Sequence, residues 1–262
     1  MLNNIQQKIE PICRIGWRPY TSDLPQQSLV SYKKAYEEGH RILLCDIRIT
    51  ADGYMVCCHD DDISKVKAFS PEGKLLSTKI SETKLNELLT YDFGRHKNIY
   101  GIKILRIEEF LEFCATYPDI TRCLELKVPL DCANQSYLVS IITKFGFENN
   151  IMFISSKDEA SVFGDLLPNS IIGKWVYSIT NEIINEVAQY KSKGKFIHVA
   201  KEGFDERCIN LDNYLKCKSK GIDIGFSFIP SSAKEYFLDL KKQGIFNYCK
   251  YISIDEISWL KE

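Results

Sequence analysis

The sequence has almost no net charge. Its 262 residues include 34 Lys and Arg against 35 Asp and Glu, which leaves a formal charge of −1 at pH 7. Nucleic acids and anionic membrane surfaces attract proteins through an excess of positive charge, and this chain has none. The balance argues against a nucleic-acid partner and against a polybasic membrane anchor.

Long apolar runs and an export signal are also missing. No segment approaches the 18 or so apolar residues of a membrane span, and residues 1–7 contain no basic stretch leading into an apolar run. We therefore expect a soluble, cytoplasmic protein without a membrane span. The ten cysteines form no C-x-x-C pair, and most stand inside apolar runs, as Cys45 and Cys123 do. This usage is typical of small buried residues in a reducing compartment rather than of a zinc site.

Segments with the period of a strand alternate with segments of helical spacing along most of the chain. Strands are expected near residues 12, 42, 122, 151, 170, 195, 222 and 248. Eight strands with helices between them are typical of an α/β fold of the (β/α)8 TIM barrel type, and a doubly wound sheet is the weaker alternative. The length suits one large barrel or two small domains, and we predict one barrel domain over residues 1–262.

The segment at about 60–101 departs from the alternation. It has an acidic start, the turn-forming Ser70-Pro71-Glu72-Gly73 and a polar stretch at 94–98, with a helix expected from Ser81 to Leu89. We interpret it as an insertion between the second strand and the following helix, able to form a lid or a small cap.

The second strand, residues 42–49, is the most informative stretch. With a period of two, its odd-numbered positions form an apolar face, whereas Asp46 lies on the other face. Asp52-Gly53 predicts a tight turn, after which a short apolar run returns His59 to the neighbourhood of Asp46. Burying a carboxylate is costly unless it is paired or bound to a metal, so Asp46 and His59 are candidate site residues.

The third predicted strand, residues 122–128, repeats the arrangement of the second. Its apolar face alternates with a face that carries Glu125 and Lys127. In a barrel the chemistry lies at the carboxyl ends of the strands, which is where Arg18, Asp46, Glu125 and Lys127 fall. The alternative is an edge strand with a solvated face and a surface Glu-Lys pair.

Four short motifs belong together. They are Gly39-His40-Arg41 through Asp46, Thr50-Ala51-Asp52-Gly53, His59-Asp60-Asp61 and Glu125-Leu126-Lys127. Together they resemble the glycerophosphodiester phosphodiesterase family, whose members are metal-dependent hydrolases built on a barrel. The similarity begins at Trp17-Arg18 and Pro25-Gln26-Gln27-Ser28, and it is thin beyond about residue 130. The resemblance implies a glycerophosphodiester or another phosphate-bearing small molecule as ligand.

The resemblance also implies roles, position by position. It makes His59 the catalytic acid or base and Asp46 and Glu125 the ligands of a divalent metal, Mg or Ca. It makes Arg18 and Lys127 the phosphate-binding groups. Trp17 is either a stacking wall for the ligand or plain packing at the mouth of the barrel.

The sequence departs from the family pattern at Gln26, where the family has a glutamate, at Ser227-Phe228-Ile229-Pro230, and at two positions that bear on the chemistry. Trp17 stands where the family has its first catalytic histidine, and Leu44 stands where it has a metal glutamate. Tryptophan cannot act as a base and leucine cannot bind a metal, so the metal site is weakened. Asp23 and Asp61 are the nearby acids that could replace the missing ligand.

The other three histidines, His40, His96 and His198, are interpreted as structural or solvated.

Two functions therefore stay open. The leading hypothesis is a divergent phosphodiesterase that hydrolyses a glycerophosphodiester, with His59 as the surviving acid or base. The alternative is a non-catalytic barrel that binds a phosphorylated small molecule or a protein partner. A ring of salt bridges among Arg18, Asp46, Glu125 and Lys127, with no space for a ligand, would favour the alternative.

Overall fold

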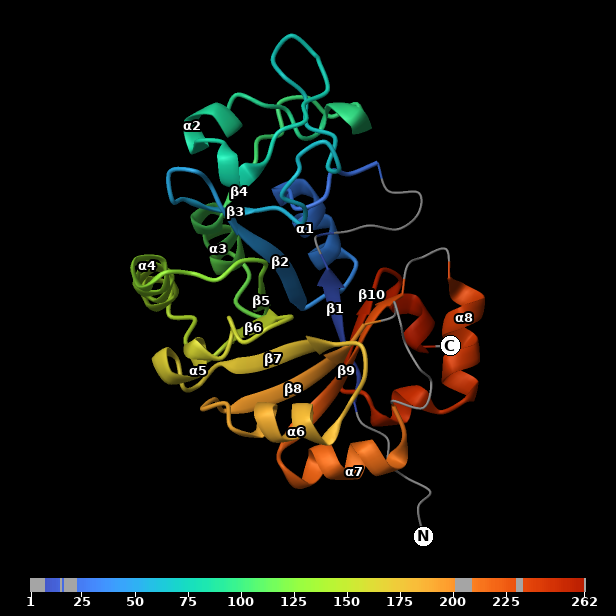
Figure 1. Cartoon of the computed structure of the whole chain (residues 1–262). Helices are drawn as coiled ribbons and strands as arrows, with labels where there is room; N and C mark the ends of the chain where they lie inside the picture. The colour runs from blue at the N-terminus through green and yellow to red at the C-terminus, as the bar shows by residue number, and fades with distance from the viewer. Residues whose placement is uncertain (1–7, 15, 17–22, 201–208, 230–232, 262) are drawn as a thin grey trace.

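The computed structural model describes residues 8–14, 16, 23–200, 209–229 and 233–261. Within these residues eight parallel strands follow one another in the order β1-β10-β9-β8-β7-β6-β5-β2, and β1 pairs with β2 to close a barrel (Figure 1). The strands are β1 (Glu10–Arg14), β2 (Ile42–Ile49), β5 (Thr121–Leu126), β6 (Ile151–Ser155), β7 (Ile171–Val176), β8 (Gly194–Val199), β9 (Ile222–Ile229) and β10 (Tyr251–Ile254). The predicted (β/α)8 barrel is confirmed.

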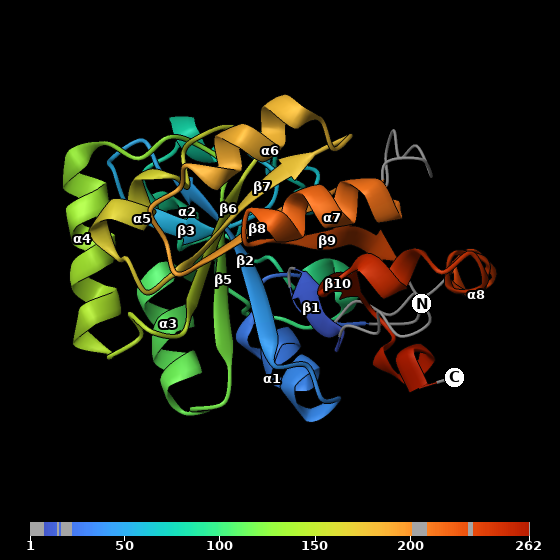
Figure 2. The same cartoon turned by 90° about the horizontal axis from the view of Figure 1, so that it is seen from below.

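Helices surround the strands on the outside (Figure 2). They are α1 (Leu29–Glu37), α3 (Ile107–Ala115), α4 (Cys132–Lys144), α5 (Val162–Leu166), α6 (Asn181–Ala188), α7 (Leu211–Ser219) and α8 (Lys234–Lys242), with 3-10 turns η4 (Ile245–Tyr248) and η5 (Ile257–Lys261) near the end of the chain. Several begin at a side-chain cap, such as Ser28, whose hydroxyl accepts from the amide of Ser31 at 3.3 Å. Of the helices that the structure describes, none is long and apolar enough to cross a membrane.

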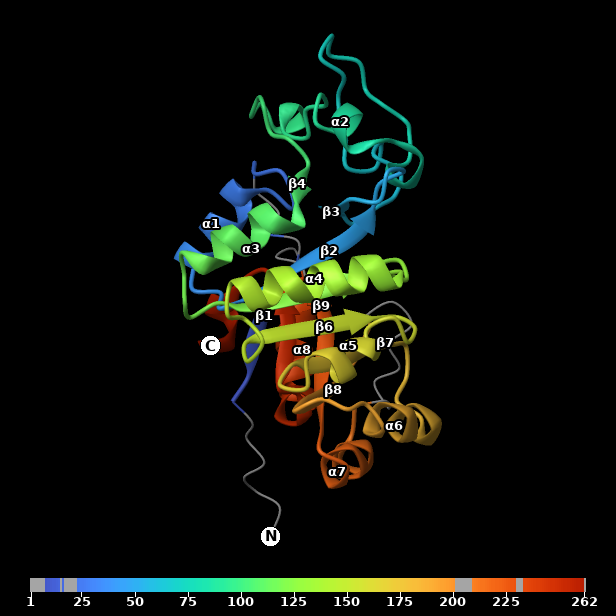
Figure 3. The same cartoon turned by 90° about the vertical axis from the view of Figure 1, so that its left-hand side faces the viewer.

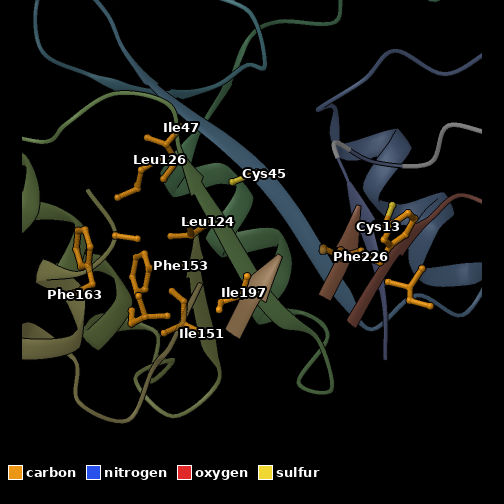
Figure 4. Packing of buried hydrophobic residues seen from close by; sticks show 14 of the residues in the cluster. Cys13, Cys45, Ile47, Leu124, Leu126, Ile151, Phe153, Phe163, Ile197 and Phe226 are labelled. Atoms are coloured by element: carbon orange, nitrogen blue, oxygen red, sulfur yellow. The ribbon is translucent and has the colours of Figure 1, made fainter. Parts of the chain in front are cut away.

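The main core lies between the strands and the helices. Leu43, Cys45 and Ile47 of β2 belong to it, as their alternation predicts. Figure 4 shows the same layer further round the barrel, where the rings of Phe153 and Phe163 stack with centroids 4.3 Å apart. Eight of the nine described cysteines are buried, as predicted, and Cys132 is exposed.

A second core fills the inside of the barrel. It consists of Ile12, Ile42, Leu44, Cys123, Met152, Ile154, Phe196 and Tyr251. Gly173 makes room for one of the large rings, because a Cβ on this residue would lie 2.2 Å from Phe196. These apolar side chains fill the interior of the barrel. Polar side chains such as Asp46 and Glu125 lie nearer the carboxyl ends of the strands.

The segment between β2 and α3 projects beyond one end of the barrel (Figures 1 and 3). It starts with the hairpin of β2 and β3 (Met55–Cys57), returns at β4 (Leu105–Arg106), and packs around a third apolar cluster that includes Ile63, Leu88 and Phe93. Its helical turns are η1 (Ile80–Glu82), α2 (Leu85–Leu88) and η2 (Arg95–Lys97).

The helix predicted from Ser81 to Leu89 is wrong in its extent. Thr83 and Lys84 are extended and separate η1 from α2. The hydroxyl of Thr83 donates to the carbonyl of Lys79 at 2.7 Å, and the amide of Leu85 donates to the distant carboxylate of Asp52 at 2.9 Å. The bond to Asp52 satisfies the amide of Leu85, which a continuous helix would pair with the carbonyl of Ser81.

Candidate functional site

A hairpin brings Asp46 and His59 to the same end of the barrel. Ile47 of β2 pairs with Cys57 of β3, and the amide of Cys58 donates to the carbonyl of Asp46 at 2.9 Å. The guanidinium of Arg48 donates to the carbonyl of His59 through Nε at 3.0 Å and through Nη2 at 2.8 Å. The backbone of His59 is therefore fixed to the strand that carries Asp46.

Asp46 and Glu125 face each other across neighbouring strands. Their Cα positions are in register between β2 and β5, and both side chains are buried. The ammonium of Lys127 pairs with both, at 3.0 Å from Oδ1 of Asp46 and in close contact with Oε1 of Glu125. Oε2 of Glu125 has no hydrogen-bond partner among the described residues. One cation thus holds two buried carboxylates.

Gln27 completes the surroundings of Asp46. Its amide nitrogen donates to Oδ2 of Asp46 at 2.6 Å, and its carbonyl oxygen accepts from the amide of the same residue at 3.1 Å. Gln27 adopts a positive φ of 52°, and the buried hydroxyl of Tyr32 donates to its carbonyl oxygen at 3.2 Å. A single residue therefore binds both the side chain and the backbone of Asp46.

His59 lies between a cation and an anion. Nη2 of Arg14, the last residue of β1, is 2.7 Å from Nε2 of His59, and Oδ2 of Asp60 is 3.2 Å from Nδ1. The Arg14 guanidinium also lies 5.5 Å from the ring centroid of Trp175, which stands on β7. Arg14 therefore connects the hairpin with the far wall of the barrel.

Burial and charge set the protonation of these groups. Burial and the charge of Asp46 raise the pKa of Glu125 to about 7, against the opposing charges of Lys127 and Arg14. Burial opposes the ionisation of Asp46, but the charges of Lys127, His59 and Arg14 outweigh it and lower its pKa. Burial also lowers the pKa of His59, so its ring is neutral at pH 7.

Several predicted residues lie elsewhere or outside the described part of the chain. Trp17 and Arg18 lie outside the described residues, so their predicted roles stay predictions. Asp61 accepts from the amide of Ser81 at 3.0 Å and from its hydroxyl at 2.7 Å, and Asp23 is exposed. Neither is among the groups that contact Asp46 or Glu125, and Leu44 packs in the inner core.

Two residues of the site were missed by the sequence reasoning. Arg14 stands in a short apolar strand, 45 positions before His59, and Gln27 stands 19 positions before Asp46. The period of two could have found Arg14, because it shares the inward face of β1 with Ile12. The contacts of Gln27 depend on its left-handed backbone, which no pattern in the chain indicates.

Comparison with known protein families identifies the family of this chain. The family model for the glycerophosphoryl diester phosphodiesterase family matches residues 18–162, more than half of the chain. The chain belongs to this family. No match is found among the curated proteins.

Solved structures of glycerophosphodiester phosphodiesterases share the fold. The enzyme from Parabacteroides distasonis is 18% identical, with a TM-score of 0.73 over 98% of this chain and 97% of that one. The enzyme from Agrobacterium tumefaciens is 13% identical, with a TM-score of 0.69 over 96% and 98%. A phosphodiesterase from Oleispira antarctica, in complex with the product sn-glycerol-3-phosphate, is 19% identical, with a TM-score of 0.70 over 97% of each chain.

The family typically uses a divalent metal, and the donors among the described residues of this chain do not fit one. Among the described residues no group of three or more His, Cys, Asp or Glu side chains could hold a metal ion. Mg²⁺ and Ca²⁺ need several oxygen ligands, but Lys127 already neutralises Asp46 and Glu125, and Gln27 occupies Oδ2 of Asp46. The inward position of Leu44 supplies no ligand.

Proposed function

We propose that this chain is a divergent glycerophosphodiester phosphodiesterase-like barrel that binds a phosphate ester of the glycerophosphodiester type without the metal-dependent hydrolysis of its family. The ligand enters at the carboxyl ends of the strands. The observation that carries the proposal is the Lys127 ammonium, which pairs with both buried carboxylates. A cation that belongs to the chain leaves the pair little attraction for a metal ion.

The remaining groups suit an anionic ligand. Arg14 and Lys127 are cations at the mouth, and guanidinium and ammonium groups are the donors that proteins use for phosphate. Arg18, in the family's Arg position, and Trp17 beside it are proposed to complete the phosphate site and its wall. The Oleispira antarctica relative, whose structure holds sn-glycerol-3-phosphate, supports a ligand of this class.

Hydrolysis is the second candidate function, and His59 favours it. A carboxylate on Nδ1 is the arrangement that orients an imidazole for proton transfer, and Asp60 stands there at 3.2 Å. With tryptophan in place of the family's first catalytic histidine, one of the two proton-transfer groups is missing. We therefore expect binding to exceed turnover.

Calorimetry with sn-glycerol 3-phosphate tests the proposal, once with EDTA and once with Mg²⁺ or Ca²⁺. We expect the same affinity under both conditions and a loss of at least tenfold in Lys127→Met. Lys174→Met is the matched control, because Lys174 is also mostly buried and also pairs with two carboxylates, those of Asp158 and Glu186.

Turnover measured on a panel of glycerophosphodiesters decides between the two functions. Metal-dependent release of glycerol 3-phosphate that is abolished by both Asp46→Ala and His59→Ala would overturn the proposal in favour of the hydrolase. Absence of both binding and turnover would exclude both functions for this class of ligand.

A further inference from the structure

Arg14 determines which nitrogen of His59 carries the proton. A guanidinium can only donate hydrogen bonds, so Nε2 of His59, 2.7 Å from Nη2 of Arg14, must accept. The proton of a neutral imidazole then stands on Nδ1, which faces Oδ2 of Asp60 at 3.2 Å. Both nitrogens are therefore engaged, and Nε2 cannot exchange a proton with a ligand while Arg14 stays in place.

The charges around the ring agree with this state. Burial, Lys127 and Arg14 all lower the pKa of His59, and Asp46 and Asp60 oppose them. Arg14 is itself held on its far side by the ring of Trp175, at 5.5 Å. The guanidinium thus donates to a neutral imidazole nitrogen, which is a weaker acceptor than an anionic oxygen.

We propose that Arg14 is a positioning residue, which keeps His59 as the Nδ1-protonated imidazole in the free protein and gives up Nε2 when a phosphate group takes the guanidinium. The second half of this inference rests on the proposed function, because it needs a phosphate at the mouth. A phosphate oxygen offers Arg14 a charge-assisted bond in place of the bond to His59. Binding of the phosphate group would then free Nε2 of His59 from its hydrogen bond with Arg14 in the same step.

Nitrogen-15 NMR of histidine-labelled protein tests the free state. Long-range proton–nitrogen spectra distinguish the two tautomers, and His59→Gln assigns the signals. We expect wild-type His59 to show a proton on Nδ1 alone, and Arg14→Met to lose this single tautomer. Arg41→Met is the control, because Arg41 precedes β2 and pairs with Asp119, and it is expected to leave the ring of His59 unchanged.

Addition of inorganic phosphate tests the exchange of partners. We expect the Nε2 signal of wild-type His59 to move toward its position in Arg14→Met, with no such movement in the variant. A proton on Nε2 in the free wild type would overturn the positioning role. In uniformly nitrogen-15-labelled protein, amide shifts near Lys127 without movement of Nε2 would overturn the exchange. If no amide responds to phosphate, the proposed function and the exchange both fail, whereas the tautomer of the free protein still decides the positioning role.

Discussion

At the scale of single residues, Lys127 determines the electrostatics of the site. Asp46 and Glu125 are buried in register on neighbouring strands, an arrangement that would be strongly unfavourable with two uncompensated negative charges. The charges of Asp46 and Glu125 outweigh the effect of burial and raise the pKa of Lys127, so the ammonium stays protonated. Lys127, two residues after Glu125, therefore has a structural role in addition to the ligand-binding role that we propose for it.

Lys127→Met should destabilise the protein by about 3–5 kcal/mol at pH 8, because it leaves buried carboxylates without their cation. The loss should shrink at pH 5, where Glu125 is protonated in the folded protein. Urea unfolding at the two pH values measures both effects.

Lys174→Met provides the comparison for this loss. The side chains of its partners Asp158 and Glu186 are 65% and 32% exposed, whereas those of Asp46 and Glu125 are 0% and 8% exposed. Water can solvate the partners of Lys174, so this control should lose less stability. Equal losses in the two variants would contradict the account.

At the scale of elements, the alternation of residues in β2 and β5 was enough to predict which side chains point inward. Both strands are central, and their apolar faces are complete, so register is fixed by burial. The hairpin that returns His59 was predictable because it is local. The position of Arg14 beside His59 depends on closure of the barrel between β1 and β2, a contact between distant segments that no local pattern encodes.

Gly225 of β9 tests how tightly the inner face is packed. A Cβ on this residue would lie 2.2 Å from Nδ1 of His198, which is buried on β8 and donates to or accepts from the hydroxyl of Ser253 at 3.2 Å. Gly225→Ala should therefore cost roughly 1–3 kcal/mol of unfolding free energy through overpacking. Chemical denaturation of Gly225→Ala, His198→Ala and the double variant Gly225→Ala/His198→Ala tests this cause. In the His198→Ala background, Gly225→Ala should reduce the unfolding free energy only slightly, because the ring that the methyl group meets is gone. An equal reduction in the wild-type and His198→Ala backgrounds would contradict the steric explanation.

At the scale of the whole molecule, the barrel combines an apolar interior with a few buried titratable groups. The insertion has its own apolar cluster, and the prediction that it belongs to one domain over residues 1–262 stays a prediction. Burial lowers the pKa of His40 to about 4 and that of His198 to about 3. These two histidines and Glu125 therefore connect the stability of the barrel to pH.

The two histidines and Glu125 change the stability of the barrel with pH in opposite directions. A histidine whose folded pKa lies below its unfolded value of about 6.5 contributes stability that is complete above that value and lost as pH falls. Glu125, whose folded pKa of about 7 lies above its unfolded value of 4.5, acts in the opposite direction: the stability that it contributes is complete below pH 4.5 and lost as pH rises to 7.

Near pH 5.5 the two histidines take up about two protons on unfolding and Glu125 releases about one, so the net uptake is about one proton. These three groups together should then lower the unfolding free energy of the wild type by about 1.4 kcal/mol per unit of decreasing pH, and His59 and His96, whose pKa values are also lowered, add to this slope. Removing the opposing group in Glu125→Gln should make the slope steeper by about 1.4 kcal/mol per pH unit, and removing one histidine in His198→Phe should make it shallower by about the same amount. Urea unfolding between pH 5 and 6 measures the three slopes. Their order is informative even if each variant changes stability by a constant amount, because a constant does not alter a slope. Three equal slopes would mean that these buried groups do not govern the acid stability of the barrel.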